Sequence, residues 1–227
     1  NVSHEIRTPL TVLVGFVETL QNLPLEPEER NRYLGLMAQQ AERMQHLVED
    51  LLALSRLEGS PLPSSNEWVP VAQLMQRCEN EARGLSSMLT RKQSLPHALS
   101  FPSAEMLAQA GEVAGASAEL QSAFSNLLAN AMRYTPQGGV LLSCRSRSRH
   151  LLIQVWDTGP GIPVREQATI FEAHYRGSAA QSHDKGLGLG LSIVSRCAEL
   201  LDVRVGLRSV PDRGSCFELW VPLATPA

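Results

Sequence analysis

Apolar residues near the start of the chain recur every three or four positions, which is the pattern of one helix face. This first stripe consists of Val2, Ile6, Leu10, Leu13, Val17 and Leu20. A second stripe consists of Met37, Ala41, Met44, Val48 and Leu51. We predict a first helix that ends near Asn22, a break at Pro24–Pro27, and a second helix that begins at Pro27, a residue suited to a first helical turn.

Two such helices joined by a short connection form an antiparallel hairpin. A hairpin cannot bury both of its apolar faces alone, so we expect two copies to pair as a four-helix bundle and the protein to be a homodimer. In the alternative arrangement, the hairpin packs on the next domain of its own chain. A stretch rich in Gly, Pro and Ser indicates a linker at residues 61–66, between a domain of residues 1–60 and one of residues 67–227.

Helical and strand-like patterns alternate after the linker. The patterns predict helices over residues 71–88, 117–134 and 189–200, and strands over residues 68–71, 98–101, 112–114, 140–147, 151–157, 203–209 and 215–221. Polar turns at 147–149 and 211–214 join the last four strands into two hairpins. The fold class of the whole chain is therefore α + α/β: a helical hairpin followed by an α/β sandwich whose mixed sheet is covered by helices on one face.

Composition narrows the possible functions. The net charge is −3 and no basic block is present, which gives no electrostatic case for a nucleic-acid partner. Cys78, Cys144, Cys197 and Cys216 are far apart, so we expect reduced thiols instead of a disulfide framework or a zinc site. No apolar run has the length of a membrane helix, and no signal peptide is visible. Because the sequence begins without Met and inside a helical pattern, we expect a fragment of a longer protein.

A His-Glu pair, His4-Glu5, lies on the first helix, and His4 is off the apolar stripe. Thr8 follows four residues later and shares a helix face with His4. Pro9 has no N–H and clashes with the carbonyl of Glu5, which predicts a kink one turn after His4. This pattern suggests a reactive group on a mobile support. For an isolated His-Glu pair, a solvated helix face is the more common interpretation.

The predicted helix over residues 117–134 carries polar groups suited to a nucleotide. Asn126, Asn130 and Arg133 lie within two turns of one helix face. Amide oxygens suit a hard cation such as Mg²⁺, and a guanidinium group can neutralise phosphate charge. A solvated face with incidental asparagines is the alternative for this helix taken alone.

Two glycine-containing segments are also suited to binding parts of a nucleotide. Asp157 ends a predicted strand and can accept a hydrogen bond from the adenine amine, while Gly159 and Gly161 allow the backbone to approach the base. Residues 185–190 have the sequence Lys-Gly-Leu-Gly-Leu-Gly and precede a helix, whose free N–H groups and dipole favour phosphate. The spacing is neither that of a Walker loop nor that of a dinucleotide fingerprint.

The segment Ser-His-Glu-Ile-Arg-Thr-Pro-Leu at residues 3–10 resembles the phospho-acceptor box of sensor histidine kinases. Residues 126–134, 157–162 and 185–191 resemble, in this order, the N, G1 and G2 boxes of the ATP-binding fold shared by histidine kinases, gyrase, Hsp90 and MutL. Residues 171–176 resemble the F box, although Ala173-His174 stands where the family usually has Pro-Phe, and residues 214–217 resemble the last glycine box. The chain looks most like the phosphate-regulon sensor kinases.

The resemblance implies that His4 accepts a phosphoryl group from ATP and passes it to an aspartate of a response-regulator receiver domain. Glu5 is then the general base, and Thr8 serves dephosphorylation of the regulator. The implied nucleotide site consists of Asn126, Asn130, Arg133, Tyr134, Asp157, Gly159, Gly161, Arg176, Lys185, Gly186, Leu187, Gly188, Leu189 and Gly190, with Asn130 and Asn126 as Mg²⁺ ligands.

The resemblance also implies that this fragment is the cytoplasmic core of a bacterial inner-membrane sensor, with no membrane contact of its own. Two other functions stay open. An ATP-driven clamp of the gyrase or MutL type needs a further transducer domain. A scaffold that binds ATP but transfers nothing does not need the intact His4 and Glu5.

The other histidines have no partner pattern that predicts a function. We expect solvated side chains at His46, His97, His150 and His183. His174 lies in the predicted lid, residues 163–185, and we expect it to pack there.

Overall fold

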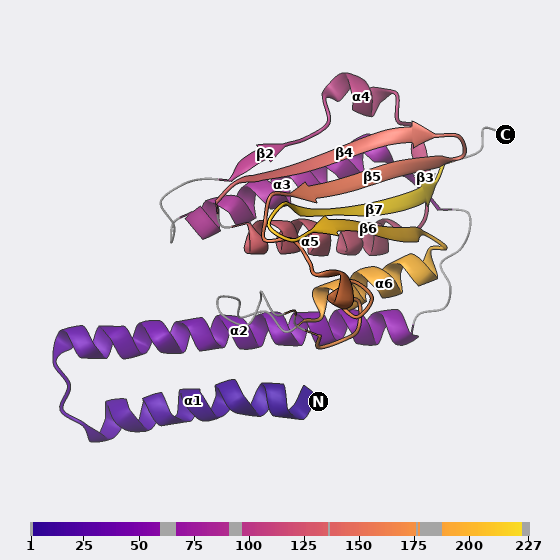
Figure 1. Ribbon diagram of the computed structural model, residues 1–227. Coiled ribbons are helices and arrows are strands. Elements are labelled where there is room, and N and C mark those ends of the chain that lie inside the picture. Colours follow the sequence, from indigo (N-terminus) through magenta and orange to yellow (C-terminus); the bar gives the residue numbers. More distant parts are fainter. Residues whose placement is uncertain are drawn as a thin grey trace. The chain divides into compact units, whose positions relative to one another are not determined.

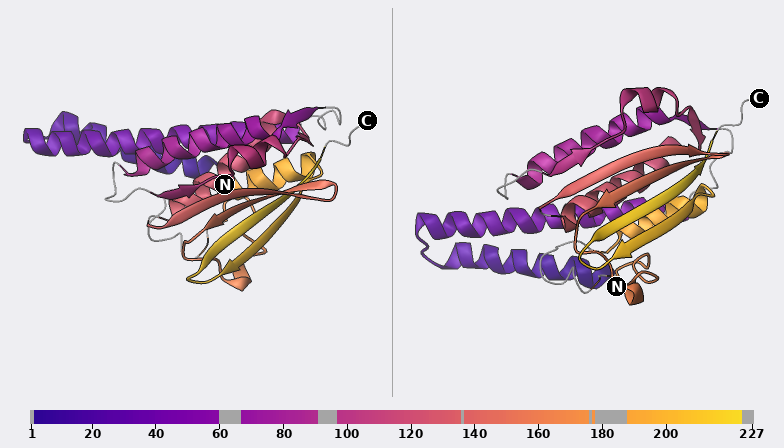
Figure 2. Two further views of the ribbon diagram at one scale, coloured as in Figure 1. Left: turned by 90° about the horizontal axis from the view of Figure 1, so that it is seen from above. Right: turned by 45° about the horizontal axis from the view of Figure 1, so that its top comes forward.

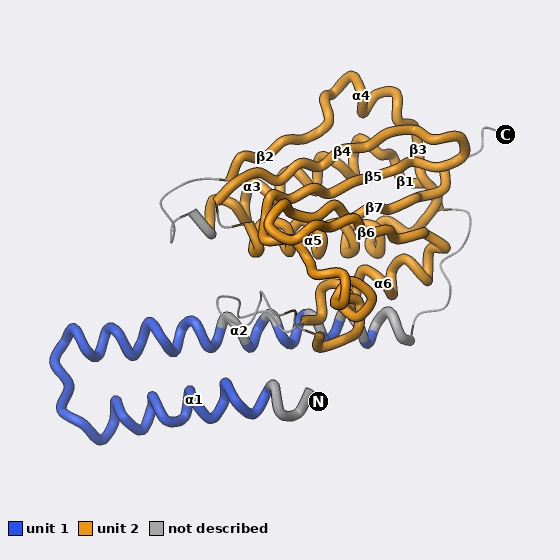
Figure 3. The backbone as a smooth tube through the Cα atoms, viewed as in Figure 1, with its two compact units in different colours: residues 1–55 blue, residues 56–227 orange. Residues whose placement is uncertain are grey.

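The computed structural model (Figure 1) describes residues 2–59, 67–90, 97–135, 137–175, 177 and 188–223. The chain divides into two compact units, residues 1–55 and residues 56–227 (Figure 3). The predicted linker at 61–66 lies outside the described residues. No helix in the described ranges has both the length and the apolar character needed to cross a bilayer.

Unit 1 is a hairpin of two helices, α1 (Val2–Asn22) and α2 (Pro27–Gly59), and α2 continues past the end of the unit. The predicted end of the first helix and the predicted start of the second are confirmed. The rings of Phe16 and Tyr33 link the two helices, with their centroids 5.6 Å apart. Pro9 lies in the interior of α1, and the kink expected there stays a prediction.

Unit 2 contains a five-stranded mixed sheet. Its strands are, in spatial order, β2 (Ala98–Ser100), β4 (Gly139–Arg147), β5 (His150–Asp157), β7 (Gly214–Pro222) and β6 (Arg204–Val210). β2 pairs with β4 in parallel, and every other neighbouring pair is antiparallel. The hairpin of β4 and β5 turns at Ser148, which has a φ of 53°. Both predicted hairpins are therefore present.

Three helices cover one face of this sheet: α3 (Val71–Thr90), α5 (Ser117–Tyr134) and α6 (Gly190–Leu200) (Figure 2). Their apolar side chains meet the inward side chains of the strands in one core. This core includes Leu74, Cys78, Phe124, Leu127, Val194, Leu142, Ile153, Phe217 and Leu219. The predicted fold, a helical part followed by a mixed sheet covered by helices, is confirmed.

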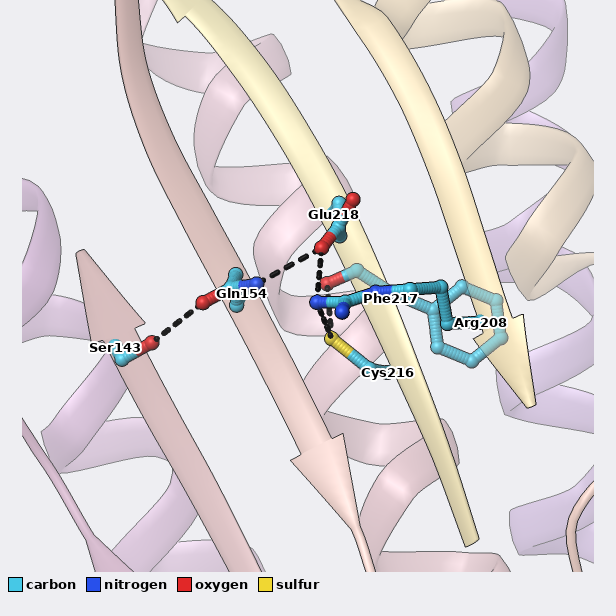
Figure 4. Close-up of polar contacts among 6 residues, drawn as sticks. All are labelled: Ser143, Gln154, Arg208, Cys216, Phe217 and Glu218. Carbon is cyan, nitrogen blue, oxygen red and sulfur yellow. Dashed lines mark hydrogen bonds and ion pairs between the residues drawn. The ribbon is translucent and has the colours of Figure 1, made fainter. Parts of the chain in front are cut away.

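The opposite face of the sheet, here called the outer face, consists of alternate residues of β4 (141–147), β5 (150–156), β7 (216–222) and β6 (204–210). Leu152 and Gln154 belong to this face but are buried, because side chains on the neighbouring strands cover them. The Gln154 amide donates a hydrogen bond to Glu218 and accepts one from Ser143 (Figure 4). The outer face is thus locally ordered by polar contacts between strands.

A second, two-stranded sheet pairs β1 (Trp68–Pro70) with β3 (Glu112–Ala114). The sequence predicted both strands but not their pairing. Two short helices were not predicted: α4 (Ala104–Ala108) and the 3-10 helix η1 (Val164–Glu166). The Ser103 hydroxyl caps α4 by accepting a hydrogen bond from the Met106 N–H. A helix of this length does not repeat often enough to give a periodic signal.

The expectation that His97 is solvated is wrong, because its side chain is only 8% exposed. Its Nε2 lies 3.2 Å from the Met132 carbonyl oxygen on α5, and its Nδ1 lies 3.1 Å from the Ser86 hydroxyl on α3. A carbonyl only accepts, so Nε2 carries the proton and Nδ1 accepts from Ser86. His150 is exposed as expected, whereas the side chains of His46 and His183 lie outside the described part of the structure.

We predict that His97→Leu lowers the free energy of unfolding of unit 2 by roughly 1–3 kcal/mol, because the Ser86 hydroxyl and the Met132 carbonyl lose buried partners. His150→Leu, at an exposed position, changes it by less than about 0.5 kcal/mol. Urea unfolding followed by tryptophan fluorescence measures the difference, since all three tryptophans belong to unit 2. Equal unfolding midpoints for the two variants would contradict the role assigned to His97.

Candidate functional site

Asp157 is fixed at the end of β5, between β4 and β7. Its Oδ1 accepts hydrogen bonds from the backbone N–H groups of Gly159, at 2.9 Å, and Ser215, at 3.2 Å. Burial raises the pKa of Asp157 above its usual range, and the hydrogen bonds from Gly159 and Ser215 offset this effect only in part. The structure therefore presents a half-buried, oriented carboxylate at this end of the sheet.

Glycines allow other backbone segments to approach Asp157. A Cβ on Gly159 would lie 2.7 Å from the Tyr134 carbonyl oxygen and 2.9 Å from Asp157 Oδ1. Gly161 has a φ of 68°, and a Cβ there would lie 2.1 Å from the Val210 carbonyl oxygen. Contacts shorter than 3 Å exclude a side chain at either position. The loop after β5 can therefore pass close to the end of α5 and to β6.

Polar side chains of β6 and of the segment after the loop hydrogen-bond the same loop. The Ser209 hydroxyl on β6 accepts a hydrogen bond of 2.7 Å from the Ile162 N–H. The Gln167 amide donates to the carbonyl oxygens of both Ile162 and Ser209, at 2.9 and 3.1 Å. On the other side, Gly214 has a φ of 95°, and a Cβ there would lie 2.0 Å from the Asp157 carbonyl oxygen. These contacts fix the loop around the carboxylate.

Asn126 and Asn130, on α5, face the first residue of α6. A Cβ on Gly190 would lie 3.0 Å from Asn126 Oδ1 and 3.4 Å from the side-chain nitrogen of Asn130. The Asn126 amide nitrogen donates to the Ser122 carbonyl oxygen at 2.9 Å, which orients its Oδ1 away from its own helix turn. Gly190 is therefore the residue that lets the start of α6 reach both amides.

The N-terminus of α6 is not capped by a side chain. The first helical bond runs from the Ile193 N–H to the Leu189 carbonyl oxygen, so the N–H groups of residues 190–192 have no partner within the helix. The preceding Gly188, with a φ of 70°, accepts a hydrogen bond from the His174 N–H at 3.0 Å, and His174 is half-buried. N–H groups that have no partner within the helix, together with the helix dipole, make this end favourable for phosphate.

The parts of the candidate site lie along one face of α5. Asn126, Asn130 and Tyr134 are four residues apart in turn, which corresponds to about 6 Å of helix axis per step. The Asp157 loop lies against Tyr134, and the start of α6 lies against the two asparagines. A carboxylate acceptor at one end and amide oxygens with free N–H groups at the other fit the base and the phosphates of an adenine nucleotide, together with Mg²⁺.

Of the other predicted site residues, some are described and some lie outside the described structure. Arg133 is exposed in the last turn of α5, and Tyr134 is half-buried. Arg176, Lys185, Gly186 and Leu187 lie outside the described residues.

The predicted acceptor residues lie on α1. His4 and Glu5 belong to this helix, although their side chains are not among those described. Thr8 is exposed on the same helix.

Sequence reasoning missed Ser209, Gln167 and Ser215. Ser215 lies opposite Asp157 in the pairing of β5 and β7, and its N–H donates to the carboxylate. Ser209 and Gln167 belong to no motif, and Ser215 is part of the last glycine box without a role that the box predicts. Strand register brings Ser209 and Ser215 to the site, and Gln167 reaches it from the end of η1.

The four cysteines do not contribute ligands. All are free and buried. Burial raises the pKa of the Cys78 thiol to about 12 and that of Cys197 to about 11, so both thiols are protonated near neutral pH. Among the described residues, no group of three or more His, Cys, Asp or Glu side chains can hold a metal ion.

Both parts of the chain match known families. Residues 1–60 match the His Kinase A (phospho-acceptor) domain, and residues 115–225 match the Histidine kinase-, DNA gyrase B-, and HSP90-like ATPase family. Full-length ShkA, solved in complex with AMPPNP, superposes with a TM-score of 0.67 at 27% sequence identity, over 99% of this chain and 45% of ShkA.

Two curated relatives agree with these matches. The phosphate regulon sensor protein PhoR of Pseudomonas aeruginosa is 39% identical over 222 residues, which cover 96% of this chain and 47% of PhoR, so the chain spans about half of that relative. The sensor histidine kinase YcbM of Bacillus subtilis is 30% identical over 226 residues, which cover 96% of this chain and 68% of YcbM. The chain therefore belongs to the sensor histidine kinases, and its similarity to PhoR confirms the predicted likeness to the phosphate-regulon sensors.

Proposed function

We propose that this chain is the catalytic core of a two-component sensor histidine kinase. It phosphorylates His4 with ATP and passes the phosphoryl group to an aspartate of a response-regulator receiver domain. The observation that carries this proposal is the arrangement along α5, with Asp157 at one end and two asparagines against the start of α6 at the other. The AMPPNP bound to the related ShkA supports ATP as the phosphoryl donor.

In the nucleotide site, Asp157 accepts a hydrogen bond from the amine of the base, and Gly159 and Gly161 let the loop lie against it. The N–H groups at the start of α6 donate to phosphate oxygens. The remaining proposed contacts to the nucleotide come from Arg133, Tyr134, Arg176, Lys185, Gly186, Leu187, Gly188, Leu189 and Gly190.

The amide oxygens of Asn130 and Asn126 are the proposed ligands of Mg²⁺. The Asn126 oxygen is oriented for this role because the amide nitrogen is bound to Ser122. When bound, Mg²⁺ neutralises charge on the phosphate oxygens.

Transfer requires little covalent chemistry from the protein. A ring nitrogen of His4 attacks the terminal phosphorus, an N–P bond forms as the bond to the bridging oxygen breaks, and ADP leaves. Glu5 takes the proton from the imidazole. In-line placement and charge neutralisation supply most of the rate enhancement.

Unit 1 is the proposed dimerisation and receiver-docking part, within a domain of residues 1–60 that is joined to a catalytic domain of residues 67–227. It exposes the apolar side chains of Leu10, Val14, Val17, Leu34, Val48 and Leu52, each 37–51% exposed. A second hairpin buries such side chains in a four-helix bundle, which makes the protein a homodimer. The parent protein is proposed to be a membrane-anchored bacterial sensor with this core in the cytoplasm.

An ATP-driven clamp of the gyrase or MutL type is not favoured. Residues 1–60 match a phospho-acceptor domain, which a clamp of that type does not use. A silent scaffold has no need for the His4-Glu5 pair.

We predict that His4→Ala abolishes labelling by γ-labelled ATP and leaves the affinity for ATP within about twofold, because acceptor and nucleotide site lie in different units. His150→Ala, an exposed histidine of unit 2, is the matched control and keeps full labelling. The label is acid-labile and alkali-stable, as a phosphoramidate is. Labelling that survives His4→Ala would remove His4 as the acceptor.

Asp157→Asn is expected to weaken binding of a fluorescent ATP analogue by roughly 10–100-fold, because a hydrogen bond to a charged acceptor contributes about 1.5–3 kcal/mol. Asp202→Asn is the control, since Asp202 is exposed. Its affinity should match that of the unchanged chain. An unchanged affinity of the Asp157 variant would exclude this residue from the base site.

Thr8→Ala is expected to leave labelling of His4 intact and to slow loss of phosphate from the regulator at least tenfold. Thr8 shares a helix face with His4, where a docked phospho-aspartate must lie, and its hydroxyl can orient a water for in-line attack. Thr11→Ala, another exposed threonine of α1, is the control.

Circular dichroism checks that α1 stays helical in both threonine variants. If Thr8→Ala reduces labelling and phosphatase activity equally, Thr8 only supports the helix beside Pro9. The same equal loss with Thr11→Ala would also contradict a specific role for Thr8.

A further inference from the structure

The outer face of the sheet is positively charged, although the whole chain has a net charge of −3. Arg145 and Arg147 on β4, and Arg204 and Arg208 on β6, are all exposed on this face. The face lies opposite the helices that carry the nucleotide site, so its charge plays no part in the proposed binding of phosphates.

Most of this charge is not compensated. Glu218 is the one carboxylate among the strand residues of the outer face, all of which are described. Arg208 forms an ion pair with it at 2.5 Å, and Gln154 donates to the same carboxylate at 2.8 Å (Figure 4). Arg145, Arg147 and Arg204 form no ion pair with any residue that the structure describes. Three guanidinium groups are thus available to a partner.

The strand register places two of these arginines on either side of an apolar strip. In one row across the sheet, Arg145 pairs with Leu152, Leu152 with Trp220, and Trp220 with Arg204. Trp220 is half-buried and Leu152 is buried beside it. Neighbouring strands are about 4.8 Å apart, so the two arginines are separated by about 14 Å. A helix with its side chains is about 10–12 Å wide and fits between them.

The spacing of the arginines along β4 also suits a bound helix. Arg145 and Arg147 are two residues apart, which is about 7 Å in a strand. Carboxylates at positions i and i+4 of a helix are about 6 Å apart along its axis. A helix that lies along the strands can therefore place two carboxylates on Arg145 and Arg147, its apolar side on Trp220, and a third carboxylate on Arg204.

We propose that the outer face is a docking surface for an acidic amphipathic helix of a partner protein. Arginine and tryptophan are the residue types that contribute most to binding energy at protein interfaces. Non-specific binding of duplex DNA rests mainly on phosphate charge, to which the apolar strip between the arginines adds little.

The test uses the full chain and a fluorescein-labelled helical peptide of about 18 residues, with leucines on one side and glutamates on both flanks. We expect saturable binding that weakens with added salt. Arg145→Glu with Arg204→Glu should weaken it at least tenfold. Arg77→Glu with Arg83→Glu, two exposed arginines of α3, makes the same change in net charge and should keep the affinity within about twofold.

Three controls decide the outcome. A scrambled peptide of equal charge must bind at least tenfold more weakly, and the ATP-analogue affinity of both variants must be unchanged, which shows that they are folded. If the two double variants weaken peptide binding equally, or if the scrambled peptide binds equally well, binding depends only on net charge. Either result would overturn the proposal. Binding of phosphatidylglycerol vesicles or duplex DNA through Arg145 and Arg204, without binding of the peptide, would replace the proposed partner.

Discussion

The hydrogen bonds from two backbone N–H groups to Asp157 Oδ1 are the constraint on which the base end of the proposed nucleotide site depends. They tie the loop after β5 and the start of β7 to one half-buried carboxylate, and they lower its pKa against the rise that partial burial causes. The arrangement requires glycine at 159 and 214, because a Cβ at either position would lie within 3 Å of a neighbouring oxygen atom. Close backbone approach around this carboxylate therefore requires glycine in two loops.

The other end of the proposed site depends on how closely α6 approaches α5. Gly190 allows this approach, and its contact with Asn126 and Asn130 places the free N–H groups of α6 next to two amide oxygens. The rigid helix α5 then fixes the spacing between the base end and the phosphate end, since its residues rise by about 1.5 Å each. The proposed site therefore rests on secondary structure elements, and the loops are held against them.

The division into two units separates the proposed acceptor from the proposed donor. Unit 1 carries His4 on a helix with exposed apolar side chains, and unit 2 carries the proposed nucleotide site beside a sheet packed on three helices. Phosphoryl transfer between them requires placement more than new chemical groups. The outer face of unit 2, with its uncompensated arginines, adds a surface by which a partner can engage the catalytic domain without covering the nucleotide site.

The sequence alone determined what depends on neighbouring residues: the period of α1 and of α5, the start of α2 at Pro27, and the glycine segments that carry the family resemblance. Only the tertiary structure decided the burial of His97, whose partners are 11 and 35 residues away, and the contact of Ser215 with Asp157, 58 residues apart. It also decided the strand order and the row of Arg145, Leu152, Trp220 and Arg204. Periodicity records which face of an element is apolar. It does not record which distant element covers that face, because strand register and packing set those contacts.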